Sequence, residues 1–400
     1  MMRNIGTVVR GVRGPIFRSG DDLARVAADC VLAAAQEANS PLRDRDVICV
    51  TESVLARTQG NYATLDQIAA DVRAKIPAGP DGKRIAAITL PILSRNRFSM
   101  LLKGIAAGVD KLYIQLAYPS DEVGYQLVSL DAVEEKGVDP YKDVLTEADF
   151  RRLFGERVEH PFTGVDYVEM YHSLAPNVEI ILANDPRAVL QYAKDVIACD
   201  IHTRRRSVRL LKAAGARTAL CLADLLNEPV NGSGYNPEYG LYGSNLATEN
   251  SVKLFPRDCQ PFVDRLADIL RKASGANVEV MVYGDGAFKD PVGGIWELAD
   301  PVVSPAHTPG LYGTPNELKL KYLADTQLRD ESGEEAMKNA RAAIRSKAAD
   351  LHGQMASQGT TPRRLTDLLG SLADLTSGSG DKGTPIVWVQ GYFDNYADEK

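Results

Sequence analysis

Strand-like and helix-like segments alternate through the middle of the chain, and this alternation constrains the fold more than any other feature of the sequence. From about residue 84, "IAAITLPIL" is followed by "RNRFSMLLKGIAAG" and "KLYIQLAYP". The alternation returns in "VEIILAND", "PRAVLQYA", "KDVIACDIH", "RRRSVRLLKAAG" and "ARTALCLADLL". Because parallel strands need crossover connections of this kind, the pattern predicts βαβ units. Residues 84–232 are therefore expected to form an α/β region.

The segments on either side of this region follow other patterns. Residues 1–83 open with the strand-like "IGTVV", continue into a helical segment that Ser19 or Asp21 can cap, and reach the strand-like "VICV". Residues 233–400 hold a loop rich in Gly, Asn and Pro, a long amphipathic helix over "GEEAMKNARAAIRSKAADLHGQM", and a final strand. A chain of 400 residues has room for two or three domains. We expect a mixed α/β fold of the α+β class, divided into 1–83, 84–232 and 233–400.

Charge and composition argue against several classes of partner. The formal net charge of -7 does not favour general attraction to nucleic acid or to an anionic membrane. No apolar run approaches the roughly 20 residues of a membrane helix, and the start of the chain lacks the apolar core of a signal peptide. The five cysteines show no C-x-x-C motif, so they indicate neither a disulfide framework nor a zinc site. We expect a cytoplasmic protein without nucleic-acid or membrane partners.

One carboxylate stands at the end of a buried-looking strand. In "VEVMVYGDGAFKDPVGG" the apolar run stops at Gly-Asp-Gly, so Asp285 lies between two glycines. Such a carboxylate is well placed to hold a divalent cation, because neighbouring backbone can approach closely. A turn aspartate that caps its own backbone explains the pattern equally well.

Two further stretches admit a site. In "YGLYGSNLATENSVKLFP", glycines let backbone N–H groups point at a phosphate beside Ser244, and Asn245 can hydrogen-bond a base, sugar or phosphate oxygen. A glycine-rich surface loop without a ligand is the alternative, and the absence of G-x-x-x-x-G-K-[ST] excludes a P-loop ATPase motif. In "HPFTGVDYVEMYH", Asp166 and Glu169 lie between two histidines, although the alternating apolar residues favour a half-exposed strand over a site.

Three separated stretches together resemble the coenzyme F-420 (F-420-0) gamma-glutamyl ligase family. They are "GPIFRSGDDLA" with "RDVICVTESVLARTQG", "YGLYGSNLATENSVKLFP" with "VEVMVYGDGAFKDPVGG", and "LTDLLGSLADLTSGSGDKGTPIVWVQGY". Their order matches that family across residues 10–60, 235–300 and 362–395. The resemblance implies a ligase core with an inserted α/β region, and a homodimer. It also implies GTP (or ATP) as co-substrate and Mg²⁺ or Mn²⁺ as the metal.

The resemblance assigns roles to individual residues. Most of the expected nucleotide-binding residues fall where the family contacts nucleotide, and Ser244 is added as the neighbour of Asn245. They are Gly14, Pro15, Ile16, Phe17, Glu52, Ser53, Arg57, Ser244 and Asn245. Arg57 replaces a lysine and keeps the positive charge for phosphate. Asp285 matches a metal-binding aspartate, so Asp285 and Arg57 are the expected catalytic pair.

The sequence also departs from the family pattern. Tyr242 stands where the family has a metal-binding aspartate, Gly286 replaces a threonine, and Leu368 replaces an acidic residue. The metal site is therefore incomplete unless Glu249, Asp367 or a residue of the added α/β region compensates. The α/β region between Arg57 and Tyr242 is far longer than in a typical family member, which points to a different acceptor.

These observations lead to one expected function and one alternative. We expect an amide-forming ligase that joins L-glutamate or a similar amine to a small carboxylate acceptor through an acyl phosphate. The acceptor could be a deazaflavin coenzyme, a folate or another acid. The alternative is a non-catalytic regulatory protein that binds a nucleotide or metabolite, which the altered metal site motivates.

Overall fold

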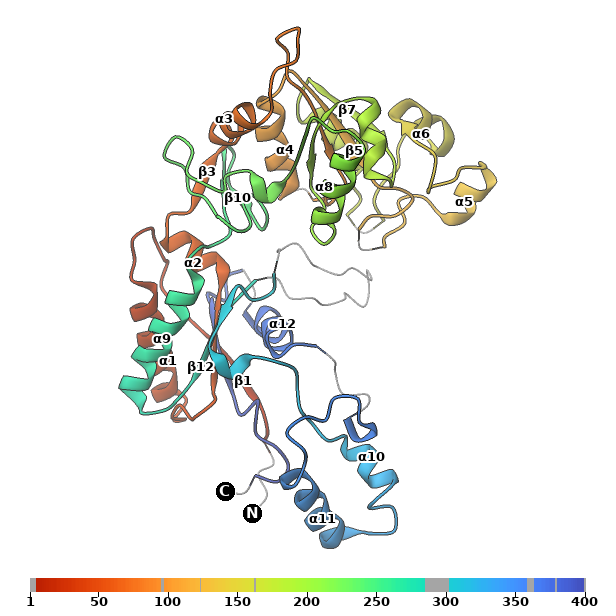
Figure 1. The fold of residues 1–400 in the computed structure, drawn as a ribbon. Helices are drawn as coiled ribbons and strands as arrows, with labels where there is room; N and C mark the ends of the chain where they lie inside the picture. The colour runs from red at the N-terminus through yellow and green to blue at the C-terminus, as the bar shows by residue number, and fades with distance from the viewer. Residues whose placement is uncertain are drawn as a thin grey trace.

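Three β-sheets organise the chain in the computed structural model (Figure 1). The structure describes residues 5–94, 97–122, 124–161, 163–284, 302–357, 363–377 and 380–398. One body surrounds a five-stranded mixed sheet, and another surrounds a six-stranded, mostly parallel sheet. A three-stranded sheet lies where the two bodies meet.

The five-stranded sheet brings together strands from both ends of the chain. Its order is β1 (Val8–Val12), β14 (Ile386–Gln390), β2 (Val47–Thr51), β12 (Glu279–Tyr283) and β13 (Ala306–His307). β2 and β12 run parallel, whereas the other neighbouring pairs are antiparallel. The central strands read as near-continuous apolar runs because both faces of the sheet are covered.

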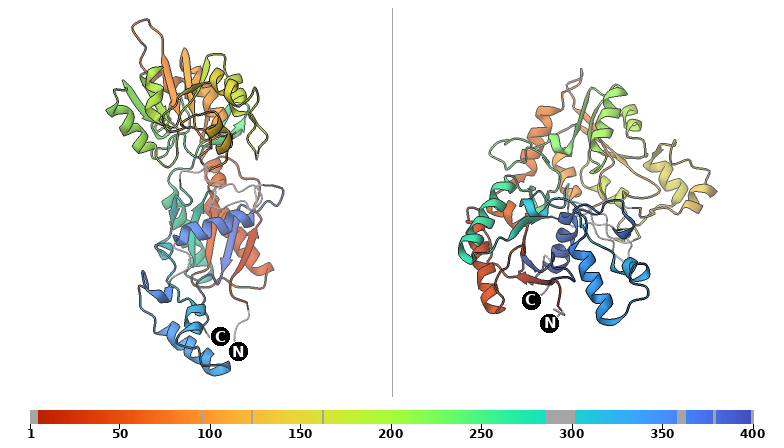
Figure 2. Two further views of the ribbon diagram at one scale, coloured as in Figure 1. Left: turned by 90° about the vertical axis from the view of Figure 1, so that its right-hand side faces the viewer. Right: turned by 60° about the horizontal axis from the view of Figure 1, so that its bottom comes forward.

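Helices cover this sheet on both sides. α1 (Leu23–Glu37) and α9 (Cys259–Ser274) pack on one face, and α12 (Leu365–Ser377) packs on the other (Figures 1 and 2). The cap of α1 is Asp22, whose carboxylate accepts a hydrogen bond from the Arg25 N–H. The predicted caps, Ser19 and Asp21, were therefore wrong by one to three residues. The buried face of α1 consists of Leu23, Ala24, Ala27, Ala28, Val31 and Ala35.

The six-stranded sheet confirms the predicted βαβ pattern and the mixed α/β fold. Its order is β6 (Leu145–Thr146), β7 (Val178–Leu182), β5 (Lys111–Leu116), β4 (Ile85–Thr89), β8 (Asp195–Ala198) and β9 (Thr218–Cys221). The edge strand β6 is antiparallel to its neighbour, and all other neighbouring pairs are parallel.

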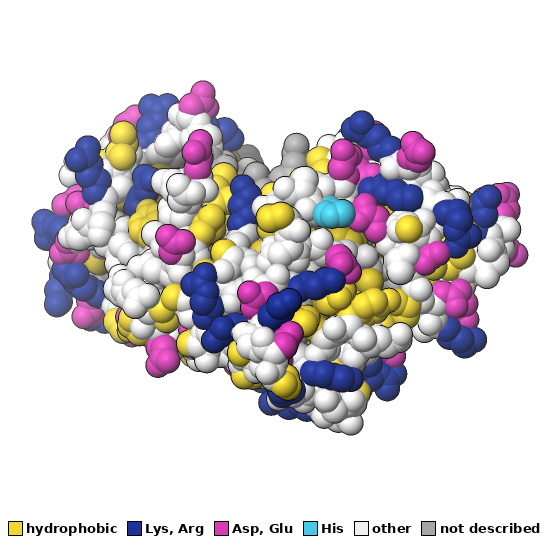
Figure 3. Space-filling view, turned by 90° about the horizontal axis from the view of Figure 1, so that it is seen from above, with side chains coloured by type: hydrophobic (Ala, Val, Ile, Leu, Met, Phe, Trp, Pro, Cys, Tyr) yellow, Lys and Arg dark blue, Asp and Glu magenta, His cyan; other side chains and the backbone are white. Residues whose placement is uncertain are grey.

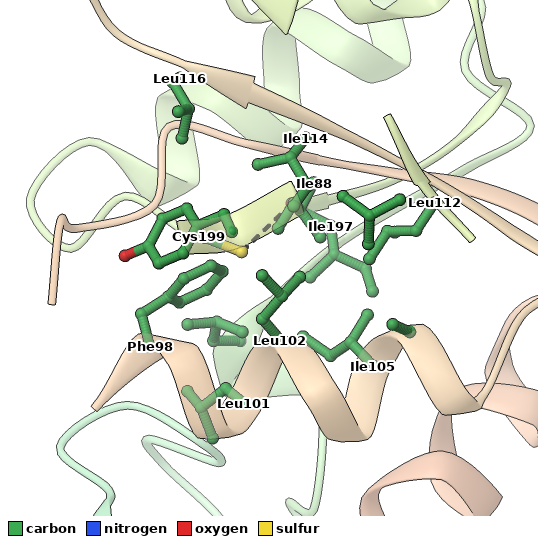
Figure 4. Close-up of a cluster of buried hydrophobic side chains, with 14 of the residues drawn as sticks. Ile88, Phe98, Leu101, Leu102, Ile105, Leu112, Ile114, Leu116, Ile197 and Cys199 are labelled. Atoms are coloured by element: carbon green, nitrogen blue, oxygen red, sulfur yellow. Dashed lines mark hydrogen bonds between the residues drawn. The ribbon is translucent and has the colours of Figure 1, made fainter. Parts of the chain in front are cut away.

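Helices pack on both faces of this sheet. α4 (Phe98–Ala107) directs Phe98, Leu102 and Ile105 at the sheet residues Ile88 and Ile114 (Figure 4). These three residues recur at the spacing of one helical face, which explains why the segment forms a helix here. α8 (Arg204–Ala213) packs on the opposite face with Leu211.

The small sheet consists of β10 (Asn245–Thr248), β11 (Ser251–Lys253) and β3 (Tyr62–Thr64). α3 (Leu65–Lys75) follows β3 and packs against α4. One hydrophobic core therefore includes residues from Ala63 to Leu254. The domain boundaries expected after residues 83 and 232 stay predictions.

The remaining elements are short or peripheral. They are α2 (Glu52–Thr58), α5 (Leu130–Glu135), α6 (Glu147–Phe154), α7 (Tyr167–Ser173), α10 (Leu320–Asp325), α11 (Gly333–Arg345) and the 3-10 turns Pro186–Gln191, Leu222–Asp224, Pro309–Leu311 and Met355–Ser357. On the face of the molecule seen from above, basic and acidic side chains are interspersed (Figure 3). Among the described residues, no helix has the length and apolar character that crossing a membrane requires.

The helix predicted over "GEEAMKNARAAIRSKAADLHGQM" is shorter than expected, because α11 ends at Arg345. The Asn316 side chain donates hydrogen bonds to the carbonyl oxygens of Ala348 and Ala349 and accepts one from the Leu351 N–H. These contacts from a distant loop hold the following residues in a non-helical path.

The strand predicted over "HPFTGVDYVEMYH" was also wrong, because its second half forms α7. The Asp166 carboxylate accepts a hydrogen bond from the Glu169 N–H and thereby caps this helix. The Arg151 guanidinium binds the same carboxylate through two hydrogen bonds of 2.5 and 3.0 Å. Burial alone would raise the pKa of Asp166, but Arg151 and the backbone N–H groups of Glu169 and Val158 hold it below its ordinary value.

Asp166→Asn is expected to lower the free energy of unfolding by about 3 kcal/mol at pH 7, because it breaks a buried ion pair. A lowered carboxyl pKa stabilises the folded state above the unfolded pKa of about 4, and this stabilisation is lost as the pH falls through the folded pKa. The difference between variant and wild type should therefore shrink below about pH 4. Urea unfolding at a series of pH values measures it.

Glu159→Gln is the matched control, since it breaks an exposed pair between Arg157 and Glu159. It should change stability by less than about 1 kcal/mol. An equal loss in both variants would contradict the role assigned to Asp166.

Candidate functional site

The carboxyl ends of β2 and β12 lie side by side in the five-stranded sheet. The two strands are parallel, and Thr51 pairs with Tyr283 in their register. Residues that follow the two strands therefore leave the sheet at the same edge. Glu52 and Ser53 follow β2, and Gly284 follows β12.

Asp285, the predicted catalytic and metal-binding residue, lies outside the described residues, as does Gly286. The described chain reaches Gly284, whose N–H donates a hydrogen bond of 2.8 Å to the carbonyl oxygen of Val303. The strand that precedes Asp285 is thus buried, as predicted, and ends beside Glu52.

Glu52 forms a buried ion pair that the sequence reasoning missed. The Lys253 Nζ donates to both oxygens of the Glu52 carboxylate, at 2.9 and 3.1 Å. The Glu52 side chain is 6% exposed and the Lys253 side chain is 9% exposed, so the two opposite charges meet away from water. The available signal was a lysine between apolar residues in "SVKLFP", where strand alternation alone would place an exposed side chain.

Asn245 lies next to this pair. In the small sheet, Asn245 of β10 is the direct cross-strand partner of Lys253, and Lys253 is also the partner of Tyr62 in β3. Directly opposite residues place their side chains on the same face of a sheet. The predicted nucleotide residues Asn245 and Glu52 are therefore brought together, with Lys253 between them.

The "GPIF" segment reaches the same edge through β14. The Gly14 N–H donates to the carbonyl oxygen of Gly383 at 3.1 Å, and the Thr51 N–H donates to that of Pro385 at 3.1 Å. Phe17 is buried in the core and anchors the segment, whereas Ile16 is 81% exposed. Pro15 is exposed as well. A Cβ atom at Gly14 would come within 2.9 Å of the Phe17 ring, so this position requires glycine for a close approach.

Arg57 lies in the last turn of α2, the short helix that begins with Glu52. Its side chain is exposed. Thr51 caps the helix by accepting a hydrogen bond of 3.4 Å from the Ser53 N–H. A guanidinium group on this surface is available to a phosphate that approaches the end of β2.

Tyr242 and Ser244 direct their hydroxyl groups at the protein itself. The Tyr242 hydroxyl donates to the carbonyl oxygen of Asp200 at 2.9 Å, and the Arg204 guanidinium lies 4.8 Å from the Tyr242 ring. Desolvation by burial raises the pKa of Tyr242 above its ordinary value, so this side chain stays neutral. The Ser244 hydroxyl donates to the carbonyl oxygen of Leu241 at 2.7 Å. Tyr242 thus packs into the α/β region and does not supply the missing carboxylate.

Glu249 and Asp367, the two acids expected to compensate for the missing metal ligand, are not part of a carboxylate cluster within the described residues. Glu249 is exposed in the turn between β10 and β11, and Asp367 is half-buried in the first turn of α12. Within the described part of the chain, no three His, Cys, Asp or Glu side chains form a group that could hold a metal ion. The described carboxylates do not make a cation site by themselves.

Nearly the whole chain, including this edge of the sheet, matches a known family. The family model described as F420-0:Gamma-glutamyl ligase matches residues 11–391, which is nearly the whole chain. The chain belongs to the F420-0:gamma-glutamyl ligase family. A search of curated proteins found no match. The predicted family is confirmed, and with it an amide-forming ligase that acts on small molecules such as glutamate.

Proposed function

We propose that the protein joins L-glutamate, or a similar amine, to a carboxylate acceptor with GTP as co-substrate. One observation carries the proposal. The "GPIF" segment, the start of α2 and the end of β12 lie at one edge of the five-stranded sheet, and Asn245 lies opposite Lys253, which binds Glu52 at that edge. Segments that are far apart in the sequence are thus neighbours in the fold, where a nucleotide is proposed to bind.

The reaction needs activation, because a carboxylate and an amine do not condense in water. An oxygen of the acceptor carboxylate attacks the γ-phosphorus of the nucleotide, and the nucleoside diphosphate leaves. The amine nitrogen then attacks the carbonyl carbon of the acyl phosphate, phosphate leaves, and the nitrogen loses its proton to solvent. The first step brings two anions together, so the site must present positive charge to them.

Arg57 is the exposed residue proposed to bind the nucleotide phosphates. Its planar guanidinium group can donate two parallel hydrogen bonds to a phosphate. Asn245, Ser53 and the "GPIF" backbone would orient the rest of the nucleotide. The choice of GTP over ATP follows the family resemblance.

A divalent cation, Mg²⁺ or Mn²⁺, completes the proposal, with Asp285 as its main ligand and Glu249 or Asp367 as a second. When bound, such an ion neutralises charge on the phosphates. The described carboxylates do not fit a metal site on their own. The α/β region is proposed to select the acceptor, and a homodimer is the proposed assembly.

The decisive experiment incubates the purified protein with GTP or ATP, Mg²⁺ or Mn²⁺, L-glutamate and one candidate acid at a time. A ligase releases phosphate only when both the acid and the amine are present, and mass spectrometry detects the amide. Tight nucleotide binding without turnover would instead support the regulatory alternative. Phosphate release that needs neither acid nor amine would contradict the proposal.

Arg57→Ala is expected to weaken nucleotide binding about tenfold or more, because a hydrogen bond to a charged group contributes about 1.5–3 kcal/mol. Isothermal titration calorimetry measures the affinity. Arg271→Ala is the matched control, since Arg271 is also an exposed arginine in the last turn of a helix, α9. Unchanged affinity in Arg57→Ala would show that another group holds the phosphates.

A further inference from the structure

The buried lysine beside the candidate site is costly for a protein to maintain. Lys253 and Glu52 are 201 positions apart in the sequence, and both are removed from water where the small sheet meets the five-stranded sheet. Desolvation of two charges can exceed their mutual attraction, so a buried ion pair is weak evidence for a role in stability. The position of the pair therefore suggests a role in the reaction.

Lys253 is placed among the groups proposed to bind nucleotide. It faces Asn245 across β10 and β11, and its partner Glu52 begins the helix that carries Arg57. An ammonium group has three N–H donors, and two of them point at Glu52. The third has no protein partner within the described residues, so it can serve a ligand.

Acyl phosphate formation brings two anions together, so it requires positive charge near the transferred phosphoryl group. By the family resemblance Tyr242 replaces a metal-binding aspartate, and its hydroxyl donates to the carbonyl oxygen of Asp200, so this position offers no charge to a phosphate. A lysine that a carboxylate holds in one orientation can stabilise the phosphoryl group without reorganisation. Burial strengthens this attraction, because the local dielectric constant is lower than that of water.

We propose that Lys253 binds the phosphoryl group that moves from the nucleotide to the acceptor, and that Glu52 is the positioning residue for Lys253. This inference rests on the proposed function. The lysine stays protonated throughout and forms no covalent bond. Its charge balances the negative charge that accumulates on the phosphoryl oxygens.

Three variants separate this role from a purely structural one: Lys253→Met, Glu52→Gln and the double variant. Lys253→Met removes the ammonium group that binds the buried Glu52 carboxylate, so it should lower the melting temperature. The double variant removes both charges and should recover most of that loss. The melting temperature therefore reports on the pair as a structural element.

Binding tests the phosphate contact directly. Calorimetry with GTP and GDP should show that wild type prefers GTP, and that the double variant loses at least about tenfold of this preference. Glu52→Gln retains the lysine, so it should keep more of the preference than the double variant. Equal GTP preference in wild type and double variant would overturn the inference, because a pair with only a structural role leaves the γ-phosphate contact intact.

Turnover gives the second measurement, with L-glutamate and an acid that wild type accepts. The double variant should remain at least about a hundredfold slower than wild type even though it is stable. If wild type ligates and the double variant ligates equally well, the role of Lys253 fails and the proposed function stands. If wild type binds nucleotide but forms no amide, the ligase proposal fails, and the loss of GTP preference still tests Lys253. A wild type that binds no nucleotide contradicts both.

Discussion

Asp285→Ala is expected to slow turnover at least about a hundredfold while the protein stays folded. A carboxylate that organises charge around a reacting phosphoryl group contributes on the order of 3 kcal/mol to the transition state. Asp285 lies outside the described residues, and the buried strand β12 that precedes it pairs with β2 through Glu279–Tyr283. The fold should therefore tolerate the change. Phosphate release that depends on acid and amine measures turnover, and thermal unfolding measures stability.

Asp131→Ala is a suitable control for Asp285→Ala, because Asp131 is an exposed carboxylate in the first turn of α5. It should leave both turnover and stability near the wild-type values. Glu249→Ala and Asp367→Ala then show which of these acids acts together with Asp285. Normal turnover in a folded Asp285→Ala protein would refute the assignment of this aspartate.

Gly240→Ala should be strongly destabilising, by about 3–5 kcal/mol, because two separate penalties add. Gly240 has a φ of +54°, and a Cβ atom there would lie 2.4–2.7 Å from the backbone carbonyl oxygens of Leu222, Ala223 and Leu225. Backbone atoms cannot move aside as a flexible side chain does. The change should displace the segment that leads to Asn245, so nucleotide binding should weaken as well.

Gly232→Ala separates the two penalties. Gly232 has a φ of +77° in the same loop region, but a Cβ atom there would meet nothing within 4 Å. Gly232→Ala should therefore lower the free energy of unfolding only by the cost of a left-handed backbone, about 1–2 kcal/mol. Hydrogen exchange shows where Gly240→Ala weakens amide protection, and the loss of protection should extend from Gly240 to the 3-10 turn Leu222–Asp224. If both variants lose a similar amount of unfolding free energy, close contact with the carbonyl oxygens is not the main cause of the destabilisation.

Hydrophobic periodicity and residues typical of helix and strand ends predicted those helices and strands whose formation depends on local sequence. The alternation of segments predicted the parallel sheet, since each strand and its crossover helix are encoded within a few tens of residues. The apolar run before Asp285 predicted β12 for the same reason. Predictions failed where a distant group intervened. Arg151 binds the cap of α7, and Asn316 holds the chain beyond the end of α11.

The candidate site was only partly accessible from the sequence. Motif resemblance named Glu52, Asn245 and the "GPIF" segment, and the structure brings these together. It did not name Lys253, because the reason for a lysine in a buried strand is a carboxylate at the start of α2, 201 positions earlier in the chain. Nor could it show that Tyr242 turns into the α/β region, where main-chain carbonyl oxygens accept its hydrogen bonds.

The amino-acid sequence by itself determined the family, the α/β pattern and the strand ends that carry the motifs, because these are written in local order and spacing. The tertiary structure alone decided which charges meet. An ion pair depends on distance and burial, and Glu52 and Lys253 meet where β11 pairs with β3, the strand that follows the helix begun by Glu52.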